Sequence, residues 1–440
     1  MTRNWNTTII VLNWNGRAFI GGCLDALLAQ TYPNYSITVV DNASSDDSVD
    51  FIRERFPQIE IICSHKNLGF AAGNNIALRR AKDDLIALVN PDVILPADWL
   101  EIRVNQMALN EQIGIAGCKL LYPESNLIQH AGGFITHPLG LPGHHGFSEK
   151  DQDQYNTERD VEYVIGAGMC IRRRVLDKIG LFDEGFFLFF EDADLCFRAR
   201  NAGYRIVYIP EAVAYHSESI TTKKGSPSYL RRFHTSRWRW LMKHFEPMEI
   251  VKDTFEAESD WLSICYLQER VVAAYAYAST LAHFDEIIQA RISDKYLNQD
   301  PLTEATQKQI RHGLITLHKQ AVGEQSLDDL KVGWQVREGA FVSQTPVIGP
   351  LLANIRRMWN GVESAPYIRQ ILNQQNAFNQ SVVEQLFETH RGTQKQASEL
   401  RTQSKELRQI SAELEESSRR LSKLRERLDE FDREQDKQGK

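Results

Sequence analysis

The sequence predicts an α/β fold built on a mixed, mainly parallel β-sheet, followed by an α-helical region and a C-terminal coiled-coil-like helix. From Thr7 to about Ile115, short β-branched runs alternate with helical patterns, which is typical of βαβ units. After Phe245 turn signals become rare, and from Tyr367 the chain is polar and helical. We therefore expect three regions, spanning residues 1–245, 246–366 and 367–440.

Three apolar runs are the expected strands, at Thr8–Asn13, Ser36–Asp41 and Asp84–Val89. Each run ends in polar residues, and the third continues into Asn90-Pro91-Asp92. Because parallel sheets bind ligands at the carboxyl ends of their strands, these polar residues indicate a ligand crevice. Helices are expected at Ala18–Ala29, Asp47–Phe56, Ala71–Ala81 and Pro96–Asn110.

The stretch Leu121–Glu162 is rich in Gly, Pro and His, and we expect it to be a long excursion that covers one side of the crevice. Four histidines lie in it, at positions 130, 137, 144 and 145. A metal site is one interpretation, but no paired Cys or carboxylate accompanies them, so the pattern favours a solvated loop.

The segment Phe186–Tyr204 runs from aromatic residues directly into Glu191, Asp192 and Asp194. A carboxylate beside an aromatic wall is partly desolvated, which raises its pKa and suits a general base. The alternative is that these acids only complement the unpaired N–H groups and the dipole of a helix N-terminus. The sequence alone leaves both interpretations open.

Composition excludes several classes of protein. The chain has 58 acidic and 51 basic side chains, and its net charge of -7 does not indicate a nucleic-acid-binding protein. The six cysteines are scattered without CxxC pairs, as in a cytoplasmic protein. No signal-peptide pattern opens the chain, and the longest apolar candidate, Val271–Ala282, is too short to span a membrane. We expect a soluble or peripheral protein.

Several motifs together resemble family 2 glycosyltransferases of the bacterial rhamnosyltransferase-like branch. The matching pieces occur in the family's order: TTIIVLNWN, VVDNASSDDS, NLGFAAGNN, LVNPDV, GAGMCIRRRV, FFEDADLCFRARNAGY and the later His216. They cover roughly half the chain. The resemblance implies a GT-A-type nucleotide-sugar-binding domain over residues 1–245.

The resemblance also implies which residues bind the donor. Asp41 matches the family's aspartate that contacts the nucleobase or ribose. The full set implied for the nucleotide sugar is Asn13, Asp41, Asn42, Ser44, Asn67, Gly69, Phe70, Asn74, Asn90, Asp92 and Gly168. For the asparagine-rich stretch the alternative is a capped helix start, and for the glycines of GAGMCIRRRV it is close packing between strands.

Asn90-Pro91-Asp92 occupies the place of the family's DxD motif, with Asn90 replacing one carboxylate. The implied metal ligands are Asp92 and His216, and the implied cofactor is Mn²⁺ or Mg²⁺. An imidazole nitrogen suits Mn²⁺ somewhat better. Without the resemblance, His216 would be interpreted as a structural residue.

Asp192 matches the base of the family's ED motif, and Glu191 is the second candidate for that role. In an inverting displacement the base removes the acceptor proton as the hydroxyl attacks the anomeric carbon opposite the leaving group. A retaining hydrolase would instead need a spaced nucleophile and acid. The Asp41 and Asp92 loops argue against hydrolysis, because a hydrolase needs no nucleotide pocket.

The segment Lys223–Lys243 contains seven Lys or Arg residues, no acid and four interleaved aromatic residues. It could bind diphosphate groups or lie on an anionic membrane. The alternative is a basic helix that covers the sheet.

Together these features predict a cytoplasmic, inverting, metal-dependent transferase, with a peripheral position on the inner face of the cell membrane as one candidate location. Its donor would be a dTDP- or UDP-linked sugar, with rhamnose as one candidate. Its acceptor would be a growing cell-surface glycan, with a lipid-diphosphate-linked form as one candidate. The alternatives are a non-catalytic nucleotide-sugar or glycan-binding protein and a coiled-coil assembly scaffold.

Leucines recur at every seventh position from Leu400 to Leu428, whereas the companion seam of this heptad pattern is only partly apolar. The pattern indicates a coiled coil and hence a homo-oligomer. The alternative is a single solvated helix with Glu/Arg pairs.

Deleting Gln394–Lys440 should therefore lower the solution mass measured by light scattering. A row of apolar residues at every seventh position of a helix is normally covered by a second helix, so its removal should weaken self-association. Circular dichroism of the shortened chain provides the control for folding. An unaltered mass would favour the solvated helix or a different partner chain.

Overall fold

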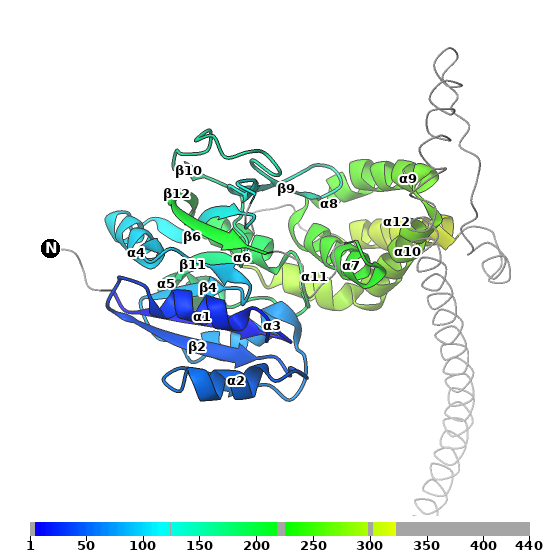
Figure 1. Cartoon of the computed structure of the whole chain (residues 1–440). Coiled ribbons are helices and arrows are strands. Elements are labelled where there is room, and N and C mark those ends of the chain that lie inside the picture. The colour runs from blue at the N-terminus through cyan, green and yellow to red at the C-terminus, as the bar shows by residue number, and fades with distance from the viewer. Residues whose placement is uncertain (1–4, 124, 218–224, 298–301, 323–440) are drawn as a thin grey trace, which may run out of the picture. The chain divides into compact units, whose positions relative to one another are not determined.

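The computed structural model describes residues 5–123, 125–217, 225–297 and 302–322 (Figure 1). These residues form a ten-stranded sheet in the order β10-β12-β6-β11-β4-β1-β2-β3, with β5 paired to β12 and β7 to β6. Its strands are β1 Thr7–Asn13, β2 Tyr35–Asp41, β3 Glu60–Cys63, β4 Leu85–Val89, β5 Val93–Ile94, β6 Ile113–Leu121, β7 Ile128–His130, β10 Arg159–Asp160, β11 Gly168–Arg172 and β12 Arg205–His216. A separate hairpin joins β8 (Gly133–Ile135) to β9 (Pro142–His144).

The sheet is mixed and mainly parallel, as predicted. β4, β1, β2 and β3 are parallel neighbours, and the register pairs Asn13 with Asp41, so the carboxyl ends of β1 and β2 meet at one edge. β11 runs antiparallel between β4 and β6, whereas β12 is parallel to β6. The predicted strands correspond to β1, β2 and β4, while β3 and β6 were not predicted.

Helices cover both faces of the sheet (Figure 1). Ile9 and Val11 pack with α1, α2 and α4, whereas Ile10 and Val40 belong to the core that contains α3, α5 and α6. This alternation follows from the two-residue period of a strand. The helices are α1 Ile20–Leu28, α2 Ser48–Arg55, α3 Gly69–Leu78, α4 Trp99–Leu109, α5 Arg173–Ile179 and α6 Glu191–Asn201. The four predicted helices match α1 to α4 with ends shifted by about three residues or fewer.

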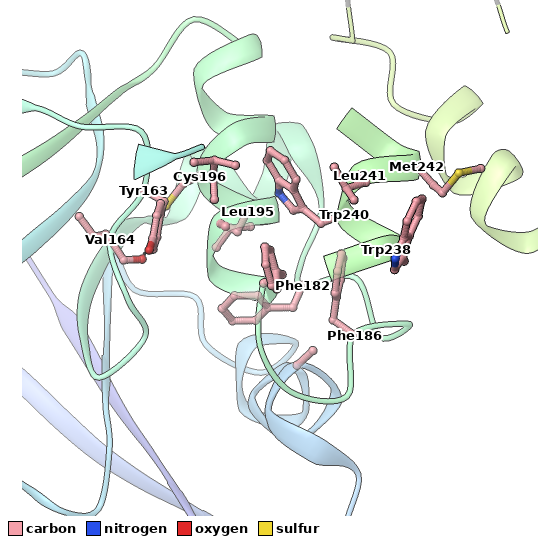
Figure 2. Packing of buried hydrophobic residues seen from close by; sticks show 14 of the residues in the cluster. Tyr163, Val164, Phe182, Phe186, Leu195, Cys196, Trp238, Trp240, Leu241 and Met242 are labelled. Atoms are coloured by element: carbon pink, nitrogen blue, oxygen red, sulfur yellow. Dashed lines mark hydrogen bonds between the residues drawn. The ribbon is translucent and has the colours of Figure 1, made fainter. Parts of the chain in front are cut away.

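A second group of helices packs against the sheet layer. These are α7 Pro227–His244, α8 Pro247–Glu249, η1 Ile250–Thr254, α9 Phe255–Ile264, α10 Leu267–Ala282, α11 Phe284–Ile292 and α12 Glu304–Val322. Trp240 of α7 contacts Phe197 of α6, and Trp238 contacts Tyr277 of α10. Figure 2 shows both tryptophans among the packed residues of this core. One hydrophobic core therefore continues from the sheet to α12, and the described residues belong to one compact unit.

The predicted boundary at residue 366 and the heptad pattern lie outside the described residues. None of the described helices is long and apolar enough to cross a membrane.

The basic segment contributes mostly to the interior. Arg237 pairs with Glu258 of α9, and Arg239 and Lys243 pair with Asp183 at 2.9 and 2.7 Å. Because these three cations are buried in ion pairs and α7 packs against α6, α10 and α11, the C-terminal half of α7 is an internal helix. This corrects the interpretation of a basic surface helix that covers the sheet. Only its first turns are available to a ligand.

The Arg237–Glu258 pair should contribute strongly to stability, because both side chains are almost fully buried and Tyr277 also donates to Glu258. Glu258→Ala leaves an unpaired buried guanidinium and should lower the free energy of unfolding by about 3–5 kcal/mol in urea denaturation. Lys308→Ala, which breaks an exposed pair, is the control and should change it by less than about 1 kcal/mol. Equal effects of the two variants would contradict this account.

Candidate active site

A cleft of about 800 Å³ opens at the carboxyl ends of β1 and β4. Its walls come from the loops after these strands, the start of α6, the end of β12, the excursion and the first turns of α7. The sequence-predicted residues on its wall are Asn42, Asn67, Gly69, Phe70, Asn90, Asp92, Glu191, Asp192 and His216. The fold thus brings together residues from Asn42 to His216, about two fifths of the chain apart.

Five other predicted residues lie outside the cleft wall, at positions 13, 41, 44, 74 and 168. Asn13 Nδ2 donates to Asp41 Oδ1 at 3.0 Å, and Asp41 Oδ2 accepts from the Ser44 N–H at 3.0 Å. Asn13 and Asp41 are buried, so they brace the loop after β2 from behind. The structure therefore does not bring the Asp41 carboxylate to the cleft wall.

Asn74 and Gly168 also have internal roles. Asn74 Nδ2 donates to the Phe70 carbonyl at 3.0 Å within α3. A Cβ at Gly168 would lie 2.7 Å from Cys118 Sγ, so this glycine allows close packing inside the sheet. Gly166, two residues earlier, does reach the cleft.

The loop before α3 is tied to the opposite wall of the cleft. Asn42 Nδ2 donates to Asn67 Oδ1 at 3.1 Å and to the Gly69 carbonyl at 3.0 Å. Gly69 has φ +78°, and a Cβ there would lie 2.1 Å from the Phe187 carbonyl oxygen. Only glycine fits this approach. The next residue, Phe70, donates its N–H to the same carbonyl at 2.7 Å.

The predicted metal ligands face each other. His216 Nε2 lies 3.2 Å from Asp92 Oδ1 and 3.4 Å from Asn90 Nδ2. The described residues contain no group of three or more His, Cys, Asp or Glu side chains that could hold a metal ion. One carboxylate and one imidazole fit a cation whose remaining ligands are water and the phosphate oxygens of a substrate.

The two carboxylates at the start of α6 occupy different environments. Glu191 is buried, and its Oε2 has no hydrogen-bond partner. Burial, together with the nearby Asp192, raises the pKa of Glu191 well above its usual range. Asp192 is partly exposed, with Oδ2 accepting from the Gly166 N–H at 3.3 Å, and burial raises its pKa to about 6. Both carboxyl groups therefore bind a proton more readily than a solvated acid does, and the partly exposed Asp192 is accessible from the cleft.

Two aromatic residues before α6 adopt left-handed backbone conformations, Phe189 at φ +71° and Phe190 at φ +66°. Each such conformation costs on the order of 1–3 kcal/mol for a bulky residue. Phe189 packs on Tyr229, and Phe190 packs on Phe233 and Trp240. These contacts hold the turn from which the first residues of α6 enter the cleft.

Asp194, the third acid of the cluster, is fully buried and is not a cleft residue. It accepts hydrogen bonds from Arg198 Nε and His244 Nε2, each at 2.8 Å, and pairs with Lys243. Burial would raise the pKa of Asp194, but Arg198, Lys243 and His244 hold it well below its usual range. Its role is to join α6 to α7.

The excursion is more ordered than the predicted solvated loop, which corrects that prediction. His130 is buried, with its Nδ1 2.7 Å from Nδ1 of His144. Burial, together with the neighbouring His144, lowers the pKa of His130 well below its usual range. His144 and Phe134 line the cleft, so part of the excursion forms a wall of it.

Sequence reasoning missed Gln129, Tyr163 and several apolar wall residues. The alternation of aromatic and basic residues at the start of α7 did indicate part of this wall, because Tyr229, Arg232 and Phe233 all line the cleft. The Arg232 guanidinium lies 4.4 Å from the centre of the Phe187 ring. Nothing in the local sequence indicated Gln129.

Comparison with known protein families shows the family to which this fold belongs. The family described as glycosyltransferase-like family 2 matches residues 5–243, and the chain belongs to this family. Membership, together with the mixed sheet and its carboxyl-edge cleft, confirms the predicted GT-A-type nucleotide-sugar-binding fold for this part of the chain.

Individual relatives cover about half of the chain. It is 30% identical over 239 residues to the uncharacterized protein y4gI of Sinorhizobium fredii and 31% identical over 211 residues to the O-antigen biosynthesis protein RfbC of Myxococcus xanthus. These alignments cover 50% and 46% of this chain but only 26% and 16% of the two relatives. An N-acetylglucosaminyl-diphospho-decaprenol L-rhamnosyltransferase of Mycobacterium tuberculosis is 23% identical over 50% of this chain and 78% of that protein.

Proposed function

We propose that this protein is an inverting glycosyltransferase that moves a sugar from a nucleoside-diphosphate donor to a hydroxyl group of a glycan. The observation that carries the proposal is the convergence in one cleft of the Asn42 loop, the Asp92–His216 pair and the partly desolvated Asp192. Family membership supports the same reaction class. Retaining hydrolysis receives no such support. In the proposed transferase the Asn42 loop binds the nucleotide, the Asp92–His216 pair serves the diphosphate and Asp192 serves the acceptor, and a hydrolase needs no nucleotide site.

In the proposed reaction, the loops at Asn42 and Asn67 bind the nucleotide, with Asn13 and Asp41 bracing them. Asp92 and His216 would hold a divalent cation, Mn²⁺ or Mg²⁺, which when bound neutralises charge on the diphosphate. Asp192 removes the proton of the acceptor hydroxyl as the new C–O bond forms and the bond to the diphosphate breaks.

Two neighbouring groups assist Asp192 in its proposed role as the base. The Gly166 N–H holds Asp192 by one oxygen. Glu191, whose Oε2 has no hydrogen-bond partner within the protein, lines the cleft beside Asp192 and orients the acceptor through a hydrogen bond.

The acceptor in this proposal is a glycan linked to a lipid diphosphate. The cleft wall next to Asp192 carries Phe187, Phe189 and Phe233, and Arg232 lies at the same side. An apolar wall with a guanidinium suits an amphiphilic molecule with phosphate groups. The mycobacterial relative carries a substrate of this kind in its name. Such an acceptor would bring the protein to the inner face of the cell membrane, and rhamnose from dTDP or UDP is the candidate donor sugar.

A panel of nucleotide sugars, offered with a lipid-diphosphate saccharide and Mn²⁺, tests the proposal directly. Transfer or donor hydrolysis with at least one donor is the expected result. Binding of a donor without any turnover would instead indicate a non-catalytic nucleotide-sugar-binding protein.

Asp92→Ala and His216→Ala should each weaken metal-dependent binding of a nucleoside diphosphate, because only two protein ligands share the cation. Calorimetric titration with and without Mn²⁺ measures the effect. The exposed residues Asp98 and His65 provide matched controls, and their alanine variants should bind as the wild type does. Unchanged metal dependence in both cleft variants would contradict the ligand assignment.

Asp192→Asn should lower the transfer rate by ~10²–10⁴-fold with donor affinity nearly unchanged, because it keeps the shape of the side chain and removes its basicity. Glu191→Gln should have a milder effect. The base acts when ionised, so the wild-type rate should rise as pH increases through about 6 and level off above it. Initial rates against pH, with donor affinity measured beside them, test both points.

Near-normal transfer by Asp192→Asn, with transfer lost in Glu191→Gln, would show that the two roles are reversed. Loss of donor binding in both variants would mean that the pair serves the nucleotide or the metal.

A further inference from the structure

Two amide side chains contact the two ring nitrogens of His216. Gln129, on β7, is 3% exposed, and its Oε1 lies 2.7 Å from His216 Nδ1. An amide oxygen only accepts hydrogen bonds, so Nδ1 carries the hydrogen. On the other side of the ring, Asn90 Nδ2, which only donates, lies 3.4 Å from Nε2. Gln129 therefore places a hydrogen on Nδ1 and leaves Nε2 as the ring nitrogen that faces Asn90 and Asp92.

Nε2 faces a carboxylate. Asp92 Oδ1 lies 3.2 Å from His216 Nε2, and both side chains are mostly buried. A hydrogen on Nε2 can donate to this carboxylate, and a divalent cation that binds Asp92 and Nε2 together replaces that hydrogen. Because Gln129 Oε1 contacts Nδ1, Nε2 is the nitrogen left for a metal.

Gln129 lies at a bulge of β7. This strand pairs antiparallel with β6, with His130 opposite Leu120 and Ile128 opposite Leu121, so Gln129 is the extra residue between two paired ones. Bulges of this kind redirect a side chain and often occur next to functional sites. The neighbouring His130 is buried against Tyr163 and His144, so the sheet fixes the backbone position of Gln129.

We propose that Gln129 is a positioning residue, which holds His216 in the Nδ1–H tautomer so that Nε2 is free to bind a divalent cation together with Asp92. The inference rests on the metal site of the proposed function. Groups that orient a metal-binding histidine through its second nitrogen typically change metal affinity 10–100-fold when they are replaced.

The test measures Mn²⁺ affinity by calorimetry in the presence of UDP. Gln129→Met removes the acceptor at similar size and should weaken Mn²⁺ binding by about 10–100-fold. Gln129→Glu restores an oxygen that accepts from Nδ1–H and should bind Mn²⁺ within a few-fold of the wild type. Gln152→Met, at an exposed position of the same excursion, is the matched control and should have no effect.

A spectroscopic readout separates positioning from a general loss of structure. The electron spin echo of bound Mn²⁺ should carry a nitrogen modulation in the wild type and in Gln129→Glu, and lose it in Gln129→Met and His216→Ala. Wild-type Mn²⁺ affinity in Gln129→Met, with binding impaired in His216→Ala, would overturn the inference and leave the metal site intact.

The tautomer itself can be measured without any metal. Nitrogen chemical shifts of ¹⁵N-labelled histidine should show His216 as the Nδ1–H form in the wild-type protein. An Nε2–H form would overturn the inference even if Gln129→Met failed to fold. Absence of Mn²⁺ binding by a wild-type protein that shows the Nδ1–H form would instead refute the proposed metal site.

Discussion

The cleft depends most on the buried carboxylate of Asp194. Three side chains surround it: the cation Arg198 from its own helix, and the cation Lys243 and the hydrogen-bonding His244 from the end of α7. A fully buried charge is tolerated only with such partners, and removing one of them leaves another charge unpaired. The start of α6 and the helix α7 therefore cannot move independently. This coupling fixes the distance between the two carboxylates of α6 and the aromatic and basic residues on the first turns of α7.

The same region contains features that reduce stability. Glu191 is buried with an unpartnered oxygen, and Phe189 and Phe190 have left-handed backbones. Unfavourable features of this kind persist only where the surrounding structure over-determines them. Here the ion cluster around Asp194 and the contact between Phe197 of α6 and Trp240 of α7 supply that constraint. Trp240 lies among the packed residues drawn in Figure 2. The consequence is a carboxylate pair in a defined geometry, with Glu191 buried and Asp192 partly exposed to the cleft.

Much of the fold and part of the candidate active site could be predicted from the local sequence. The strands at Thr8–Asn13 and Ser36–Asp41 have apolar runs with clear polar ends, and both formed as parallel neighbours. The carboxylates of α6 and the Asp92–His216 pair did meet in one cleft. Burial was harder to predict, because it depends on contacts far apart in the chain. Asp41 is buried against Asn13 and does not line the cleft. The basic residues in the C-terminal half of α7 form ion pairs with buried acids, such as Arg239 with Asp183. Gln129 contacts His216, which lies 87 positions further along the chain.

The excursion between β6 and β11 has two tasks in one segment, because it carries Gln129 behind His216 and Phe134 and His144 on the cleft wall. The two tasks lie in different parts of the segment. The hairpin β8-β9 can change together with the molecule that the cleft binds, whereas strand β7 has to stay unchanged to keep Gln129 against His216. Loop exchange between relatives should accordingly be cut after His130, so that the recipient keeps its own amide.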